Sequence, residues 1–124
     1  MAETHIKRIL IVDDDAELCD EMAEMLIGEG HSVDTAHDGS AGLCLAAQNH
    51  YDLILLDYKL PGPGPRSTIE RMRKRQPGAQ ILLVSGRPFH HKLIGEEHLA
   101  SLVNGAVDKP FTAESLLEKI RSLG

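Results

Sequence analysis

The sequence alternates short apolar runs with longer amphipathic stretches, and this alternation constrains the fold more than any other feature. The apolar runs predict buried strands at residues 9–12, 32–36, 52–56, 80–84 and 105–107. The strongest runs have no polar residue at every second position, which is typical of parallel strands covered on both faces. The pattern therefore predicts an α/β domain with a five-stranded parallel sheet between two layers of helices.

The stretches between these runs predict five helices. Apolar residues at helical spacing mark residues 16–27, 40–49 and 66–76, with Asp15 as the expected cap of the first helix. Thr112 can cap a last helix that buries Leu116 and Ile120. A fourth helix is expected at residues 88–102, but Gly95 interrupts it. We therefore expect this helix to be the least stable element.

Length and composition exclude several classes of protein. The 124 residues suit one domain, expected to span residues 1–124 with no output domain. The net charge of −6 disfavours direct nucleic-acid binding. No apolar run is long enough to cross a membrane, and the N-terminus lacks the apolar region of a signal peptide. Cys19 and Cys44 are expected to be free, partly buried thiols, so we expect a cytoplasmic protein.

The charges are distributed unevenly along the chain. Between Ile9 and Tyr58 there are twelve acidic residues and no Lys or Arg. Residues 59–124 contain eleven basic residues and six acidic ones. Four of the basic residues form a cluster on the third predicted helix, namely Arg71, Arg73, Lys74 and Arg75. We expect this cluster to be a solvated face, with a docking surface for a partner as the alternative.

Polar side chains follow the predicted strands at the points where they end. Asp13 and Asp14 follow the first strand, and Asp57 follows the third. Ser85 follows the fourth, and Lys109 lies just after the fifth. Ligands of open parallel sheets bind beyond the carboxyl ends of the strands, so we expect these side chains to converge there.

Three carboxylates that lie within a few ångströms repel one another, unless one is protonated or a divalent cation neutralises them. Oxygen ligands with open positions suit Mg²⁺, or Mn²⁺ as the alternative ion. A carboxylate beside the metal can attack phosphorus and form an acyl phosphate. Lys109 and Ser85 could then bind the phosphoryl oxygens, so the set predicts Mg²⁺-dependent phosphoryl transfer.

The sequence resembles the receiver domains of two-component response regulators over essentially its whole length. The motifs that carry the resemblance are Ile9-Leu10-Ile11-Val12-Asp13-Asp14-Asp15, the strand that ends in Asp57, Leu60-Pro61-Gly62, Val84-Ser85-Gly86 and Asp108-Lys109-Pro110-Phe111. The resemblance implies a single flavodoxin-like, doubly wound domain with strand order 2-1-3-4-5 and five helices.

The resemblance also implies a role for each site residue. Asp57 would be the phosphoacceptor, Ser85 the switch hydroxyl and Lys109 the counter-ion of the phosphoryl group. The implied metal ligands are Asp13, Asp14, Asp57 and the backbone carbonyl oxygen of Lys59.

Residues that flank these positions would tune the lifetime of the phosphoryl group. In similar proteins the positions of Lys59 and Arg87 control how water reaches the acyl phosphate, and Gly86 lies between Ser85 and Arg87. Because long basic side chains can cover the phosphoryl group, we expect slow dephosphorylation. The Lys109–Pro110 peptide bond is expected to be cis.

Two positions depart from the family pattern. Ala106 stands where the family usually has an aromatic residue that couples to the switch hydroxyl, and Pro65 stands where Gly is usual. The stretch from Ser85 to Lys109 is also slightly longer than is usual in the family. We therefore expect the signal to leave by a remodelled fourth helix, or to leave only weakly.

The resemblance implies a signalling protein that catalyses only its own phosphorylation and slow dephosphorylation. The donor would be a sensor histidine kinase or a histidine phosphotransfer protein, which would dock on the acidic first helix. The readout would be an unknown downstream protein, and a homodimer could form through the fourth and fifth helices.

Two other functions stay open at this point. The chain could be a protein-binding module that keeps the receiver fold but signals without phosphorylation. It could also be a phosphohydrolase of the haloacid-dehalogenase type, which uses strand-end Asp, Ser and Lys residues with Mg²⁺. That family requires Thr or Val two residues after its second Asp, where this chain has Glu17.

Overall fold

The computed structural model describes residues 7–58, 65–86, 101–109 and 111–123. Its elements in chain order are β1 (Arg8–Val12), α1 (Ala16–Gly28), β2 (Ser32–Ala36), α2 (Gly39–Gln48), β3 (Leu53–Asp57), α3 (Pro65–Arg75), β4 (Gln80–Gly86), β5 (Gly105–Lys109) and α6 (Ala113–Ser122). The expected fourth helix falls largely within residues 87–100, outside the described residues.

The strands form one parallel sheet in the order β2-β1-β3-β4-β5, which confirms the predicted topology. The register places Val12, Leu56, Leu83 and Ala106 in one row across the sheet. Because the strands are parallel and in register, the residues after this row meet at one edge. That edge carries the candidate site.

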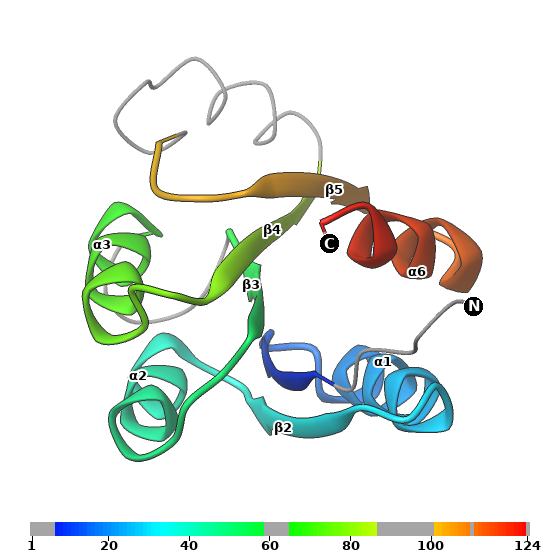
Figure 1. Cartoon of the computed structure of the whole chain (residues 1–124), viewed down its shortest axis with the longest axis horizontal. Coiled ribbons are helices and arrows are strands. Elements are labelled where there is room, and N and C mark those ends of the chain that lie inside the picture. The colour runs from blue at the N-terminus through cyan, green and yellow to red at the C-terminus, as the bar shows by residue number, and fades with distance from the viewer. Residues whose placement is uncertain (1–6, 59–64, 87–100, 110, 124) are drawn as a thin grey trace.

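Helices cover both faces of the sheet, as predicted. In Figure 1, α1 and α6 lie on one side of the strands, and α2 and α3 lie on the other. Alternate strand residues are buried against the two layers: Ile9 and Ile11 pack with residues of α1 and α6, whereas Leu10 and Val12 pack with residues of α2 and α3. This double burial explains why β1 and β3 lack polar alternation.

Three local signals set the helix ends. The Asp15 carboxylate accepts a hydrogen bond from the Leu18 backbone N–H and caps α1. The Thr112 side chain accepts one from the Ser115 backbone N–H and caps α6, so both predicted caps are confirmed. Pro65 is the first residue of α3, where its fixed φ suits a helix start and its missing N–H costs no helical bond.

Two sequence predictions need correction. The fourth and fifth strands were expected to end at Val84 and Val107, but β4 continues to Gly86 and β5 to Lys109 because each supplies the other with parallel partners. The cysteines are not partly buried: Cys19 on the sheet-facing side of α1 is fully buried, and Cys44 on α2 is exposed. Among the described residues, no helix is long and apolar enough to span a membrane.

Candidate functional site

Asp13 lies directly after β1 and is 1% exposed. Its backbone N–H donates to the Ala36 carbonyl oxygen over 3.0 Å, so β2 holds it in place. The two carboxylate oxygens have different partners: Oδ1 accepts from the Asp15 backbone N–H at 3.0 Å, and Oδ2 accepts from Lys109 Nζ at 2.8 Å. The Asp13 carboxylate is therefore fixed by a turn on one side and by β5 on the other.

Asp57 ends β3 beside Asp13 and is 7% exposed, whereas Asp14 is exposed to solvent. One carboxylate oxygen from each of Asp13, Asp14 and Asp57 lies within 4.8 Å of the other two. An all-oxygen set with one solvent-exposed member fits Mg²⁺, which prefers a few carboxylates and keeps several waters. The structure thus brings together the three carboxylates that the sequence placed at the strand ends.

Lys109 reaches this cluster from β5. Its Nζ lies 2.8 Å from Asp13 Oδ2 and 3.6 Å from Asp57 Oδ2. Burial by itself lowers the pKa of the Lys109 ammonium, but the hydrogen bond that it donates to Asp13 and the charges of Asp57 and Asp13 outweigh burial and raise this pKa above its usual value. Lys109 therefore stays charged at neutral pH and offsets part of the negative charge of the site.

Cys19 on α1 contacts the backbone of Asp13, and the sequence analysis did not predict this contact. Its thiol donates a hydrogen bond to the Asp13 carbonyl oxygen over 3.2 Å. Burial and the nearby Asp13 charge raise the pKa of this thiol to about 11, so it stays protonated at neutral pH. The only signal in the sequence was the helical spacing of Cys19, Met22 and Leu26, which marks the buried face of α1.

The structure describes only some of the other site residues that the sequence predicts. The backbone of Ser85 pairs with Asp108, and that of Gly86 pairs with Lys109, so both lie at the carboxyl end of β4 next to the carboxylates. Lys59, Arg87 and Pro110 lie outside the described residues. Their predicted roles, and the cis peptide bond, stay predictions.

Comparison with known families identifies the family to which a chain with this carboxylate cluster belongs. The family model described as "Response regulator receiver domain" matches residues 9–121. The chain belongs to that family. It is thus a receiver domain of the two-component response regulators, and its strand-end carboxylates form the acidic pocket of the domain.

Two curated relatives are similar to this chain, and one of them is named as a response regulator. The receiver domain is 36% identical over 115 residues to the uncharacterized transcriptional regulatory protein YkoG of Bacillus subtilis, covering 92% of this chain and 49% of that protein. It is 33% identical over 116 residues to the response regulator ArlR of Staphylococcus aureus, covering 94% of this chain and 52% of that protein. The chain therefore spans about half the length of these relatives.

Solved structures agree with the fold. The receiver domain resembles response regulator TrrA of Thermotoga maritima, solved in complex with Mg²⁺-BeF, with a TM-score of 0.82, 29% identity, and coverage of 96% of this chain and 100% of that chain. A CheY-like receiver domain from Methanospirillum hungatei matches with a TM-score of 0.81 and 29% identity, covering 95% of this chain and 93% of that chain.

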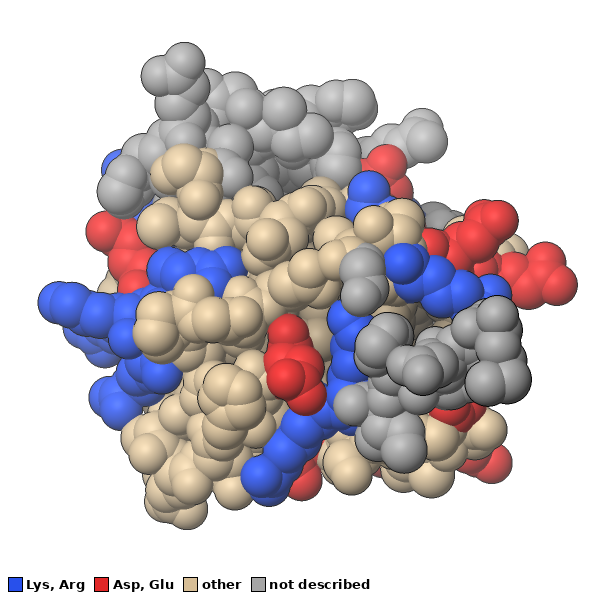
Figure 2. Space-filling view, in the orientation of Figure 1, with Lys and Arg blue, Asp and Glu red and all other residues tan. Residues whose placement is uncertain are grey.

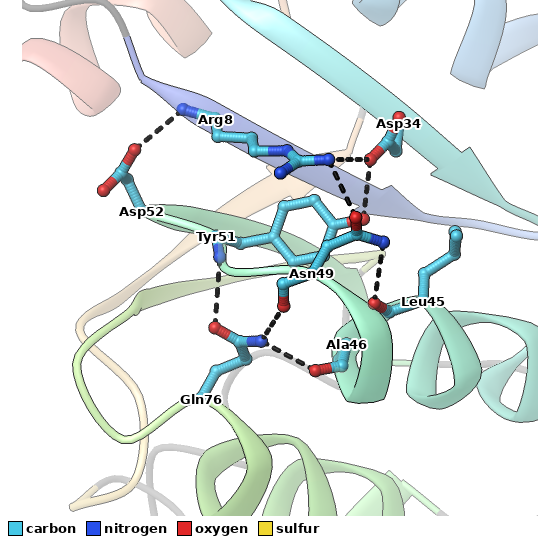
Figure 3. A network of polar contacts seen from close by, with 8 residues as sticks. All are labelled: Arg8, Asp34, Leu45, Ala46, Asn49, Tyr51, Asp52 and Gln76. Carbon is cyan, nitrogen blue, oxygen red and sulfur yellow. Dashed lines mark hydrogen bonds and ion pairs between the residues drawn. The ribbon is translucent and has the colours of Figure 1, made fainter.

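The opposite edge of this receiver domain carries a polar network with a structural role (Figure 3). The Tyr51 hydroxyl donates to Asp34 Oδ2 over 2.7 Å, and the Arg8 guanidinium lies 5.5 Å from the centre of the Tyr51 ring. The buried Gln76 side chain accepts from the Tyr51 backbone N–H and donates to two carbonyl oxygens at the end of α2. The network joins α2, α3, β1 and β2 at the edge away from the carboxylates.

Arg73 corrects the expectation of a wholly solvated basic face on α3. Its guanidinium donates to the carbonyl oxygens of Leu102, Gln76, Pro77 and Ala79, and to the Asn104 side-chain oxygen. It points inward because the connection between α3 and β4 and the turn that precedes β5 both present carbonyl oxygens there that need donors. The rest of the cluster is exposed: Arg71, Lys74 and Arg75.

Proposed function

We propose that this receiver domain accepts a phosphoryl group on Asp57 in a Mg²⁺-dependent reaction, with a phosphohistidine as the donor. The observation that carries the proposal is the convergence of Asp13, Asp14 and Asp57, with Lys109 Nζ between Asp13 and Asp57. The structure of TrrA in complex with Mg²⁺-BeF supports the proposal, because that similar protein binds Mg²⁺ together with BeF.

The positions of these groups support the following transfer. An Asp57 carboxylate oxygen attacks phosphorus, the phosphorus–nitrogen bond of the donor breaks, and the histidine leaves as a neutral imidazole after it gains a proton. Asp13, Asp14 and Asp57 would hold Mg²⁺, with the Lys59 carbonyl oxygen as a further ligand. When bound, the metal neutralises charge on the phosphoryl oxygens.

Lys109 and Ser85 would stabilise the product. Lys109 Nζ is already 3.6 Å from Asp57 Oδ2, so a small displacement from Asp13 would bring it onto a phosphoryl oxygen. Ser85 would supply a hydroxyl from the end of β4. Arg87 and Lys59 would slow the attack of water, which gives a long-lived acyl phosphate.

The donor protein would dock on α1. Its exposed acidic residues are Glu17, Asp20, Glu21 and Glu24. Response regulators partner with sensor histidine kinases, and a basic surface on the donor would complement this helix. The readout would be a downstream protein, and a location in the cytoplasm would suit such an exchange.

Intact mass after incubation with Mg²⁺ and a small acyl or amido phosphate tests the proposal. We expect the mass to rise by one phosphoryl group in the native chain and not in Asp57→Asn. The matched control is Asp20→Asn, which makes the same change on the exposed face of α1 and should be phosphorylated normally.

The other candidate functions predict different results. If the native chain gains no phosphoryl group with or without Mg²⁺, it is a phosphorylation-independent binding module. Ala106 in the row of Leu56 and Leu83 favours this second candidate, since the usual switch aromatic is missing there. Sustained turnover of a simple phosphate ester would instead indicate a phosphohydrolase.

A further inference from the structure

The exposed face of α1 carries an acidic stripe formed by Glu17, Asp20, Glu21 and Glu24. These residues recur at the spacing of one helical face, so their charges lie side by side. In the part of the chain that the structure describes, no ion pair involves any of the four. Among the described residues, the stripe is therefore an acidic surface without a paired basic side chain.

The exposed face of α3 carries the opposite charge. Arg71, Lys74 and Arg75 are exposed at helical spacing and form a basic patch, while Arg73 is held inward by backbone carbonyls. Figure 2 shows Lys and Arg side chains gathered at the edge of the molecule where α3 lies in Figure 1. Within the described ranges, no ion pair involves the three patch residues.

The stripe and the patch cannot meet within one molecule. They lie on helices that cover opposite faces of the sheet, so the whole sheet separates them (Figure 1). Each molecule therefore carries the acidic stripe on one side of the sheet and the basic patch on the other. Such a charge distribution favours contact between the acidic side of one copy and the basic side of another.

An exposed apolar side chain lies next to the acidic stripe, and a surface pocket lies next to the basic patch. Ile27 is 57% exposed and lies one helical turn beyond Glu24, at the end of the acidic stripe. Arg75 borders a surface pocket of about 360 Å³ between the C-terminal ends of α2 and α3. The lining is mixed: Ala46, Ala47, Pro77 and Gly78 are small and apolar, whereas Gln48, Asn49, His50, Arg75 and Gln76 are polar.

We propose that copies of this chain associate head to tail, with the acidic stripe of one copy on the basic patch of the next and Ile27 in the pocket. A parallel alignment of α1 on α3 satisfies both contacts. Ile27 lies one turn beyond Glu24, and Arg75 at the end of α3 itself lines the pocket, so a Glu24–Arg75 pair lies within roughly one helical turn, about 5 Å, of both. Pairing the charges therefore brings Ile27 to the pocket.

The contact differs from a symmetric dimer because it joins two different surfaces. A heterologous contact leaves a free stripe at one end and a free patch at the other, so the assembly grows with concentration. Its strength should be modest, because exposed ion pairs are weak and each copy carries a net charge of −6. High salt should abolish it.

Sedimentation equilibrium of the full chain at low and high salt tests the proposal. At low ionic strength the weight-average mass should rise above the monomer's 13.6 kDa as the protein concentration increases. At 1 M salt, where the Debye length is ~3 Å, it should return to the monomer. A chain that stays monomeric at high concentration and low salt would overturn the proposal.

Charge-reversed variants identify the two surfaces. The stripe variant Glu21→Lys/Glu24→Lys and the patch variant Arg71→Glu/Lys74→Glu should each stay monomeric alone. Their equimolar mixture should associate, because the patch variant keeps an acidic stripe and the stripe variant keeps a basic patch. Ile27→Asn should weaken the association of the native sequence several-fold.

The matched control makes the same charge change as the stripe variant on another helix. Glu114 and Glu118 are exposed on α6, so Glu114→Lys/Glu118→Lys should associate as the native chain does. If this control loses association as fully as the stripe variant, net charge and not the stripe is responsible. A mixture of stripe and patch variants that stays monomeric, while the native chain associates, would place the contact elsewhere.

Discussion

Lys109 offsets part of the negative charge of the carboxylate cluster, so it competes with any cation that binds there. Its ammonium is 2.8 Å from Asp13 Oδ2 and 3.6 Å from Asp57 Oδ2. At ~4 Å a unit charge contributes several kcal/mol even at an effective dielectric constant of ~20. We therefore expect Lys109→Met to tighten Mg²⁺ binding by about tenfold in a calorimetric titration, although solvent reduces the full Coulomb term.

The control for this titration is Lys119→Met on α6, outside the carboxylate cluster, which should leave the Mg²⁺ affinity of the chain unchanged. Weaker Mg²⁺ binding in Lys109→Met would contradict the competition between the ammonium and the cation. It would mean that Lys109 instead holds the carboxylates in a shape that the metal needs.

Cys19 predicts how stability depends on pH. Burial raises the pKa of its thiol in the folded chain from 9.0 to about 11, so folding favours the protonated form. The contribution of the protonated thiol to stability is complete below pH 9 and is lost as the pH rises through 11. The two-unit difference in pKa corresponds to about 3 kcal/mol. We expect the urea concentration at the midpoint of unfolding to decrease as the pH is raised from 9 to 11. The decrease should be smaller in Cys19→Ala.

Thiol reactivity provides an independent measurement on the same residue. A thiol reagent should modify exposed Cys44 quickly in the native chain and should reach Cys19 only after unfolding. Cys44→Ser should then leave no fast-reacting thiol. Rapid modification of Cys19 in that variant would show that α1 does not protect the back of the site.

At the residue scale, the sequence predicted those contacts that follow from strand ends alone. Asp13, Asp57 and Lys109 converge because parallel strands in register must end at one edge. The hydrogen bond from Cys19 to the Asp13 carbonyl and the inward turn of Arg73 could not be predicted. Both depend on how a helix is rotated about its axis and on which carbonyl oxygens lack donors. The hydrophobic period of the sequence carries no information on either.

At the level of elements, the close approach of α2 to β1 positions the strand that leads into Asp13. A Cβ atom on Gly42 would lie 2.8 Å from Val12 Cγ2, closer than real contacts allow. Alanine should gain about 1 kcal/mol in helix propensity but cost ~1–3 kcal/mol through overpacking. We expect Gly42→Ala to lower the free energy of unfolding, measured in urea.

Two further variants separate packing from helix propensity. A Cβ on Gly28 at the end of α1 has no neighbour within 4 Å, so Gly28→Ala should not destabilise the chain. Adding Val12→Ala to Gly42→Ala removes the atoms that clash, and should cost less than the sum of the two single changes. Strict additivity of the two would argue against this contact.

Arg73 joins α3 to the turn that leads into β5. Its guanidinium donates to the Leu102 and Ala79 carbonyl oxygens over 3.0 and 2.6 Å and to Asn104 Oδ1 over 3.1 Å. Arg73→Lys keeps the charge but cannot make this fork of bonds. We expect faster amide exchange at residues 102–105, whereas the neighbouring change Lys74→Arg should leave exchange there unaltered.

The elements also show where sequence patterns stop being informative. The order of helices and strands followed from hydrophobic period, and Asp15 and Thr112 marked helix starts correctly. The ends of β4 and β5 could not be predicted from the hydrophobic period, because Ser85, Gly86 and Asp108 are polar or small. These residues join the sheet through backbone pairing between β4 and β5. Strand pairing of that kind is a property of two segments, not of either one.

For the whole molecule, the separation of charge between α1 and α3 affects both proposed partners. The acidic stripe on α1 would serve as the docking surface of a kinase and as one side of the contact between copies. Glu21→Lys/Glu24→Lys should therefore slow phosphotransfer from a phosphohistidine protein at least several-fold, because the basic donor loses its complement. The rate with a small phosphate donor should not change.

High salt should reproduce the effect of this double variant on the native chain. Screening weakens exposed charge pairs, so phosphotransfer from the protein donor should slow steeply with added salt, while the small donor is affected little. Equal losses for both donors would show that the variant damaged the site itself. Independence of salt would contradict an electrostatic dock on α1.

The central claim is that Asp57 forms the acyl phosphate, and chemical trapping tests it most directly. Borohydride reduces an acyl phosphate to an alcohol, so an aspartyl phosphate leaves homoserine at the position that held the phosphoryl group. After incubation with Mg²⁺ and a small phosphate donor, mass spectrometry of peptides should locate this change at Asp57 alone. Homoserine at Asp13 or Asp14, or at no position in a chain that gained the phosphoryl mass, would contradict the account.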